Sequence, residues 1–218
     1  MVSLIAAAER EGKAMGAVIF IAACAPFQCA KLGALQSAGY GVVTLYLVKH
    51  RLVNQPSPAS VRAAVPADVP AIVAMGAQSQ QVLFAANPKM WTPHPDAPAR
   101  FSAWMLFSLN LPDRRIFVSP EPERAGFVIA QPASPMRLPL TCKREHVGLV
   151  DDFWTPEFAA TDKFGYSTAR DLLTTAEQEF VQRGRTSAMV ICADGCRSKQ
   201  DFLRHADYRD GNAWLLKA

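Results

Sequence analysis

Apolar residues recur along the chain with two spacings, one typical of helices and one typical of strands. Short apolar runs that end at polar or small residues predict buried strands, and apolar residues three and four apart predict helices that cover a sheet. From Ser60 onward the predicted order is strand, helix, helix, three strands, helix, strand, helix, strand. This alternation predicts an α/β fold with a mixed central sheet flanked by helices.

The predicted boundaries follow from these spacings and from turn residues. Proline near a helix start is favourable, because the first-turn N–H groups have no partner within the helix. The predicted elements are a strand at Val61–Val65, a helix that opens at Pro66–Pro70, a helix at Ala97–Leu109, a β-hairpin made by Arg115–Ser119 and Gly126–Gln131, a strand at His146–Trp154 and a helix at Ala169–Arg183.

The first fifty residues resemble the last fifty. Aligning Leu4–His50 with Leu172–Ala218, an offset of 168 residues without a gap, gives 13 identical pairs among 47. Each segment predicts a helix that ends at a glycine, Gly16 or Gly184, followed by a strand, a helix and a strand. The sequence therefore predicts a duplicated half-domain. The identical pairs include Leu4/Leu172, Ala8/Ala176, Glu9/Glu177, Cys24/Cys192, Lys31/Lys199, Tyr40/Tyr208 and Lys49/Lys217.

A stretch of linker composition, Asn54–Ser60, separates the first segment from the rest. We therefore expect a partial half-domain at residues 1–53, a linker at 54–60 and a complete domain at 61–218. The offset is about the length of one domain, so the chain is expected to be a tandem pair without its front part. Because about 50 residues are marginal alone, we expect the fragment to dock on the complete domain or on a second chain, and to carry no active site.

Charge and hydropathy exclude two classes of partner. The net charge is +4, with five basic and two acidic residues in positions 1–60 and 18 basic and 17 acidic residues thereafter. No dense basic face is predicted, which argues against a nucleic-acid partner. The apolar run Ala17–Phe27 is about half of the roughly 20 residues that span a bilayer, and no basic start of a secretory signal precedes it. No membrane segment is expected.

The five cysteines do not form a metal motif. Cys192 and Cys196 are four apart and Cys24 and Cys29 five apart, and no histidine completes a zinc-like spacing. Together with Cys142 they make an odd number. Buried, reduced thiols and a cytoplasmic location are expected.

The element order and four local sequences resemble the GNAT superfamily of acyl-CoA-dependent N-acetyltransferases. The resemblance covers Ser60–Ala218 and implies a GNAT-like mixed sheet, with acetyl-CoA as the acyl donor and an amine as the acceptor. The stretches that carry it are Val61–Ile72 as the opening strand and helix, Val147–Trp154 as the central fourth strand, Phe164–Leu173 as the pyrophosphate loop and third helix, and Arg183–Tyr208 as the fifth strand, the fourth helix and the aromatic residue that follows it.

The resemblance also implies a cofactor site. The family pattern Gln/Arg-x-x-Gly-x-Gly/Ala places Phe164, Ser167 and Ala169 at its signature positions, so a phenylalanine and a serine replace the usual polar residue and glycine. A helix start can hold a diphosphate on its free N–H groups, and an ordinary serine or threonine cap is the alternative. The implied cofactor-binding residues are Phe153, Trp154, Phe164, Gly165, Tyr166, Ser167, Thr168, Ala169, Arg170 and Asp194. Asp194 is alternatively a cap for the helix that begins near Cys196.

For catalysis, the resemblance implies a carboxylate base near the end of the fourth strand, where Asp151 and Asp152 lie. Alternation along a strand would send these two side chains to opposite faces. The tyrosine that commonly serves as acid lies five residues before the aromatic, and Leu203 stands at that position. Direct attack by the amine then needs no dedicated acid, because a thiolate is a tolerable leaving group.

Three readings of the function stay open. The chain is an acetyltransferase acting on a small-molecule amine or a protein amino group, or a degenerate acyl-CoA-binding or structural module, or chiefly a homodimer formed through its N-terminal segment. Nothing in Ala71–Leu109 identifies the acceptor. Core packing is favoured over an acceptor pocket for Met90, Trp91, Trp104 and Phe107, and Lys199 and Lys217 are expected to face solvent.

Overall fold

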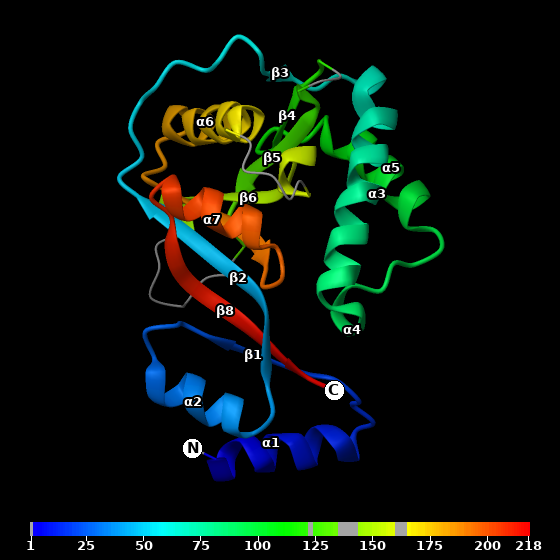
Figure 1. The fold of residues 1–218 in the computed structure, drawn as a ribbon, viewed down its shortest axis with the longest axis vertical. Helices are drawn as coiled ribbons and strands as arrows, with labels where there is room; N and C mark the ends of the chain where they lie inside the picture. Colours follow the sequence, from blue (N-terminus) through cyan, green and yellow to red (C-terminus); the bar gives the residue numbers. More distant parts are fainter. Residues whose placement is uncertain (1, 122–123, 135–143, 160–164) are drawn as a thin grey trace.

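The computed structural model describes residues 2–121, 124–134, 144–159 and 165–218 (Figure 1). The helices are α1 (Val2–Ala14), α2 (Cys29–Ser37), α3 (Val69–Ala86), α4 (Pro88–Trp91), α5 (Ala97–Ser108), α6 (Ser167–Gln182) and α7 (Arg197–His205), with short 3₁₀ turns η1 (Pro66–Asp68), η4 (Arg144–His146) and η5 (Pro156–Phe158). The strands are β1 (Phe20–Cys24), β2 (Gly41–His50), β3 (Arg62–Ala63), β4 (Arg115–Ser119), β5 (Gly126–Pro132), β6 (Val147–Trp154), β7 (Ser187–Ala193) and β8 (Arg209–Lys217).

All eight described strands join one sheet in the order β1-β8-β2-β7-β6-β5-β4-β3. Neighbouring strands are antiparallel except β6 and β7, which run parallel, so the sheet is mixed as predicted. Figure 1 shows α6 and α3 on opposite sides of strands β4–β6. The predicted α/β fold with helices on both faces of the sheet is therefore confirmed.

Most predicted elements after Ser60 are present, with two differences. The first strand is only the two residues of β3, because it lies at the sheet edge, pairs with β4 alone and is soon followed by Pro66, which has no backbone N–H. Helix α4 was not predicted. Asn87 caps it, accepting a hydrogen bond from the backbone N–H of Met90 at 3.1 Å, and Pro88 occupies its first position.

Residues 2–50 contribute β1 and β2 to this same sheet. Strand β2 lies between β7 and β8, and β1 lies beyond β8. The expectation that this segment docks on the rest of the chain is thus confirmed by its strand pairing. The β2–β8 register is symmetrical under the 168-residue offset, because Gly41 opposes Leu216 and Arg209 opposes Val48, with Leu45 opposite Ala213 at the centre.

Two ion pairs join the segment to the rest of the chain. Lys217 Nζ lies 2.8 Å from Glu9 Oε2, and Lys49 Nζ lies 2.9 Å from Glu177 Oε2. The expectation that Lys217 simply faces solvent is wrong, because Glu9 draws its ammonium group back against α1.

Candidate functional site

The sheet opens between β6 and β7. Val147–Val150 pair with Ser187–Val190, and beyond this point the two strands no longer pair with each other. The second half of β6 pairs with β5, while the second half of β7 pairs with β2. Parting parallel strands leave backbone groups and side chains facing a gap, which is a common position for a ligand site in α/β sheets.

A β-bulge in β6 positions the two candidate carboxylates at this gap. Ala130 opposes Val150 and Val128 opposes Phe153, so β6 carries one residue more than β5 between these pairs. The extra residue interrupts the alternation that would send Asp151 and Asp152 to opposite faces, and both line the same cavity. Gln131 on β5 donates a hydrogen bond to Asp151 Oδ2 at 2.9 Å and so fixes that carboxylate.

The cavity at the gap has a volume of about 280 Å³ and is walled by β2, β6, β7, α3 and α4. Three of its lining residues carry a buried polar atom without a hydrogen-bond partner in the described part of the chain: Thr44 Oγ1, Trp91 Nε1 and Trp154 Nε1. An indole N–H can only donate, and leaving such a group unpaired costs about 1–3 kcal/mol. The wall is therefore suited to a ligand with carbonyl oxygens.

A second, larger cavity of about 740 Å³ lies between α3 and α5 and the segment that leads into α5. Its wall is mainly apolar, and it includes Phe101 and Trp104, whose rings stack with centroids 5.9 Å apart. Both cavities are lined by Ser79, Leu83 and Asp152, so they adjoin at the Asp152 carboxylate.

The aromatic residues predicted to be core residues are divided by the structure. Met90 and Trp91 line the first cavity, and Trp104 lines the second. Phe107 is exposed. The interpretation of these residues as core packing is therefore wrong, because the chain between α3 and α5 turns their side chains toward the cavities or toward solvent.

Lys199 crosses the gap between the strands. Its Nζ donates to the backbone oxygen of Phe153 on β6 at 2.9 Å and lies 5.2 and 5.6 Å from the ring centroids of Phe153 and Phe158. It was expected to face solvent, but it is half-buried and lines the first cavity. Lys31, its counterpart at the 168-residue offset, instead bonds to Ala23 of its neighbouring strand β1.

The start of α6, where the resemblance places the diphosphate, already holds an anion. Glu157 in η5 accepts hydrogen bonds from the backbone N–H of Ala169 at 2.9 Å and of Thr168 at 3.3 Å. A carboxylate is well placed there, because the N–H groups and the helix dipole both favour negative charge. Sequence reasoning missed Glu157, which lies 11 and 12 residues before the groups it binds.

The other residues predicted for the diphosphate differ in exposure. Gly165, Ser167 and Arg170 are exposed, and Tyr166 has a left-handed backbone with φ 48° just before the helix. Phe164 lies outside the described residues.

The strand ends contribute in different ways. The Phe153 ring packs in the core against Phe158 and Phe202, so its backbone oxygen is what faces the gap. The Trp154 indole lines the cavity.

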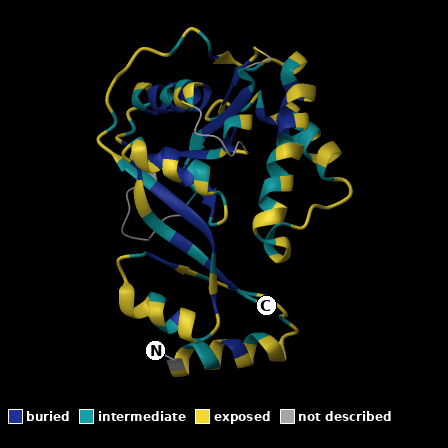
Figure 2. Ribbon diagram, viewed as in Figure 1, coloured by how far each residue is buried: buried dark blue, intermediate teal, exposed yellow. Residues whose placement is uncertain are grey.

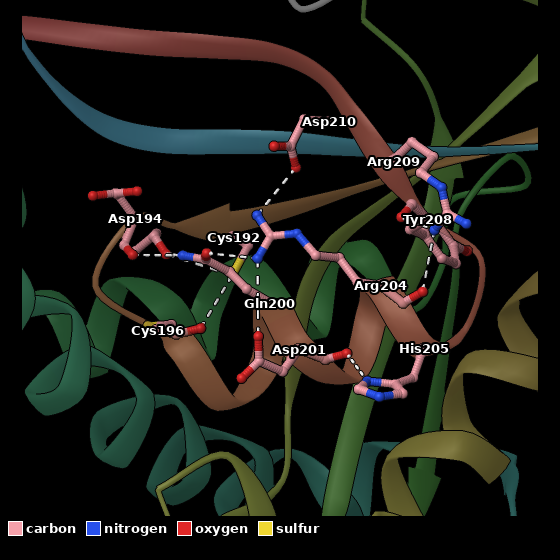
Figure 3. Close-up of polar contacts among 11 residues, drawn as sticks. Cys192, Asp194, Cys196, Gln200, Asp201, Arg204, His205, Tyr208, Arg209 and Asp210 are labelled. Atoms are coloured by element: carbon pink, nitrogen blue, oxygen red, sulfur yellow. Dashed lines mark hydrogen bonds and ion pairs between the residues drawn. The ribbon is translucent and has the colours of Figure 1, made fainter. Parts of the chain in front are cut away.

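Asp194, at the end of β7, is not the cap of α7. The N-cap is Cys196, which makes no side-chain capping bond. The Asp194 backbone oxygen accepts from the Gln200 side-chain amide, within a network that also joins Arg204 to Asp210 (Figure 3). This network holds α7 against the ends of β7 and β8.

No tyrosine of α7 reaches the cavities. Leu203 is fully buried in the core. Tyr208 is also buried, and its hydroxyl donates to Glu177 Oε1 at 2.8 Å. Burial, together with the Glu177 charge, raises the pKa of Tyr208 well above its usual value. His205 is exposed and bonds to the backbone oxygen of Asp201.

The cysteines of the described residues are free thiols. Cys24 and Cys192 are buried, Cys196 is half-buried beside the first cavity, and Cys29 is exposed, contrary to expectation. Cys142 lies outside the described residues. Burial raises the pKa of Cys192 to about 12 and also raises the pKa of Cys196, so neither thiol is activated as a nucleophile.

Known sequences and structures were compared with this chain. No protein-family model and no curated protein sequence matches it. Among solved structures, it is similar to a GCN5-related N-acetyltransferase from Sphaerobacter thermophilus, with 14% identity and a TM-score of 0.53 over 92% of this chain and 59% of that chain. It is also similar to a GNAT-family acetyltransferase from Colwellia psychrerythraea, with 14% identity and a TM-score of 0.55 over 90% of this chain and 63% of that chain.

A tetramutant of a Bacillus halodurans protein matches as well, with 12% identity and a TM-score of 0.54 over 68% of this chain and 92% of that chain. At these identities the likeness shows the fold, and the fold is that of the GNAT acetyltransferases. No helix among the described residues is long and apolar enough to cross a membrane.

Proposed function

We propose that the chain transfers an acyl group from acetyl-CoA to a primary amine by direct attack in the two adjoining cavities. The observation that carries this proposal is the position of Asp152 where the gap between β6 and β7 meets the larger cavity under α3 and α5. One cavity suits the acyl group and the other the amine, and a carboxylate stands between them.

In the proposed reaction, Asp152 removes a proton from the ammonium group of the acceptor. The neutral amine attacks the thioester carbonyl, a C–N bond forms, the C–S bond breaks, and the CoA thiolate leaves and takes up a proton. The indole N–H groups of Trp91 and Trp154 are the available donors for the carbonyl oxygen. Asp151, which Gln131 holds, orients the site beside Asp152.

The experiment is turnover with acetyl-CoA and a panel of amines, with Asp152→Asn as the main variant. Loss of a general base typically costs at least about 100-fold in kcat, so we expect that loss with little change in the KM for acetyl-CoA. Asp201→Asn is the matched control, because Asp201 is an exposed aspartate on α7. Equal activity of the wild type and Asp152→Asn would contradict the assignment of the base.

One observation favours a second candidate function, a non-catalytic module. Acetyl-CoA fits the start of α6 only if Glu157 releases the N–H groups of Thr168 and Ala169, since its carboxylate stands where the diphosphate would bind. Lys199 similarly occupies the backbone oxygen of Phe153. A chain that keeps both contacts would retain the fold without binding the cofactor.

Glu157→Gln distinguishes the two functions. The variant removes the competing charge, so for an acetyltransferase we expect about tenfold tighter binding of acetyl-CoA, measured by calorimetry, with turnover retained. Glu145→Gln, an exposed glutamate in η4, is the control. No binding by either the wild type or Glu157→Gln at millimolar acetyl-CoA would exclude the transferase and favour the structural module.

A further inference from the structure

Residues 2–50 present an apolar face that the described part of the chain leaves open. Strand β1 is an edge strand whose only partner among the described strands is β8. Figure 2 shows that α1 and α2 are largely exposed, in contrast to the central strands. Six large apolar side chains of this segment are exposed: Leu4, Met15, Val18, Ile19, Ile21 and Phe27. Monomers rarely leave such a cluster and a free strand edge together.

The same face is covered at the other end of the chain. Leu4 is 73% exposed, whereas its identical counterpart Leu172 on α6 is fully buried. Leu172 lies against Gly126 of β5. Ile21 on β1 is 52% exposed, whereas its counterpart Met189 on β7 is 1% exposed. The cover consists of β4, β5 and β6, on which α6 packs.

The strand that covers β7 indicates what would cover β1. On its open side β7 pairs in parallel with β6, through Ser187–Val190. The counterparts of these residues at the 168-residue offset are Ile19–Ala22, at the free edge of β1. The ion pair Glu9–Lys217 holds α1 in the same way that Glu177–Lys49 holds α6, so the open face is presented in the matching orientation.

We propose that residues 2–50 are the back half of a second domain of this fold, and that the α1–β1 face binds the front half of such a domain. The partner is a unit equivalent to residues 60–169, and its counterpart of β6 pairs in parallel with β1. The solved structures agree with this proposal: 92% of this chain aligns with only 59% of the Sphaerobacter chain, so that structure extends well beyond this one.

The test joins residues 60–169 directly ahead of Val2 of the full chain. This junction reproduces the spacing of Ala169 and Arg170, so the added strand stands to β1 as β6 stands to β7. We expect the amides of Phe20–Cys24 to exchange with deuterium at least about tenfold more slowly than in the 218-residue chain, because a strand edge becomes paired. Unchanged exchange would overturn the proposal.

Two variants of the fusion control this measurement. Ile21→Lys puts a charge into the new interface and should abolish the added protection. Phe107→Lys changes a side chain that is equally exposed but lies on α5, away from this face, and should leave the protection unchanged. Equal protection in all three fusions would mean that the added residues do not bind at β1, which also overturns the proposal.

A second measurement uses the 218-residue chain itself. Leu4→Lys and Ile21→Lys should reduce binding of an apolar dye and leave the Tm within about 2 °C, because exposed positions contribute little to stability. A large fall in Tm would mean that the chain's own core needs these side chains, and would overturn the proposal. So would a dimer in light scattering that Ile21→Lys converts to a monomer, since a second copy would then occupy the face.

Discussion

The segments 2–50 and 167–217 have nearly the same local structure but very different surroundings. Helices α2 and α7 keep the same bounds when shifted by 168 residues, and Gly16 and Gly184 both end a helix with positive φ. Yet Leu4 lies in solvent and Leu172 in the core. Sequence pattern therefore determines where a helix begins and ends, whereas neighbouring elements determine what its apolar face is worth.

The two segments are also interlocked rather than placed side by side. Each glutamate pairs with the lysine of the other segment, Glu9 with Lys217 and Glu177 with Lys49. In each case a tyrosine, Tyr40 or Tyr208, hydrogen-bonds to the glutamate, and the lysine lies 5.7 Å from its ring centroid. The exchange follows from the insertion of β2 between β7 and β8.

The largest expected difference between the segments is at the paired leucines. Leu172→Ala should lower the free energy of unfolding by about 3 kcal/mol, because it leaves a cavity in a closed core. Leu4→Ala should change it by less than about 0.5 kcal/mol, because that side chain is exposed. Urea unfolding followed by circular dichroism measures both. Equal losses would show that the two faces are equally packed in solution.

The paired tyrosines should differ less. Tyr208→Phe leaves the buried Glu177 with one charged hydrogen bond fewer and should cost about 1.5 kcal/mol, whereas Tyr40→Phe should cost less, because Tyr40 lies near the protein surface. Thermal unfolding at pH 7 compares the two variants. A greater loss for Tyr40→Phe would reverse the ranking.

These tyrosines also predict a dependence on alkaline pH. Burial raises the pKa of Tyr208 and, more weakly, that of Tyr40 in the folded chain. The stability linked to each is fully present below the usual tyrosine pKa of about 10 and is lost as the pH rises from there toward the folded pKa. Stability measured from pH 8 to 11 should therefore fall, and the fall should be shallower in Tyr208→Phe. An unchanged slope would show that Tyr208 is accessible to solvent.

The smallest contrast should be at the helix-ending glycines. Gly16 and Gly184 have φ of 85° and 72°, and neither has a heavy atom within 4 Å of an added Cβ. Gly16→Ala and Gly184→Ala should each cost about 1 kcal/mol, from the left-handed backbone alone. A much larger loss at Gly184, measured by urea unfolding, would mean that packing, rather than the backbone, distinguishes the two segments there.

Local signals predicted much of the fold. The β4–β5 hairpin, α5 and α6 follow from apolar spacing and turn residues, and Asp151 and Asp152 were expected at the end of β6. The rest depends on contacts between distant residues. The bulge in β6 appears only when β5 pairs with it, and nothing in the local sequence links Glu157 to the start of α6 or Lys199 to Phe153. Asn87-Pro88 was a local signal for α4 that could have been used.

The place of β2 at the centre of the sheet has a consequence for how the chain folds. Leu45 pairs with Ala213, so a strand made early in synthesis can gain its full set of partners only when the last strand has emerged. Pairings between residues so distant in sequence slow folding, because the chain must lose the entropy of a long loop before it gains the contact. During that interval β2 is an apolar strand with both edges free. A nascent chain of this kind would depend on chaperones until its final residues leave the ribosome.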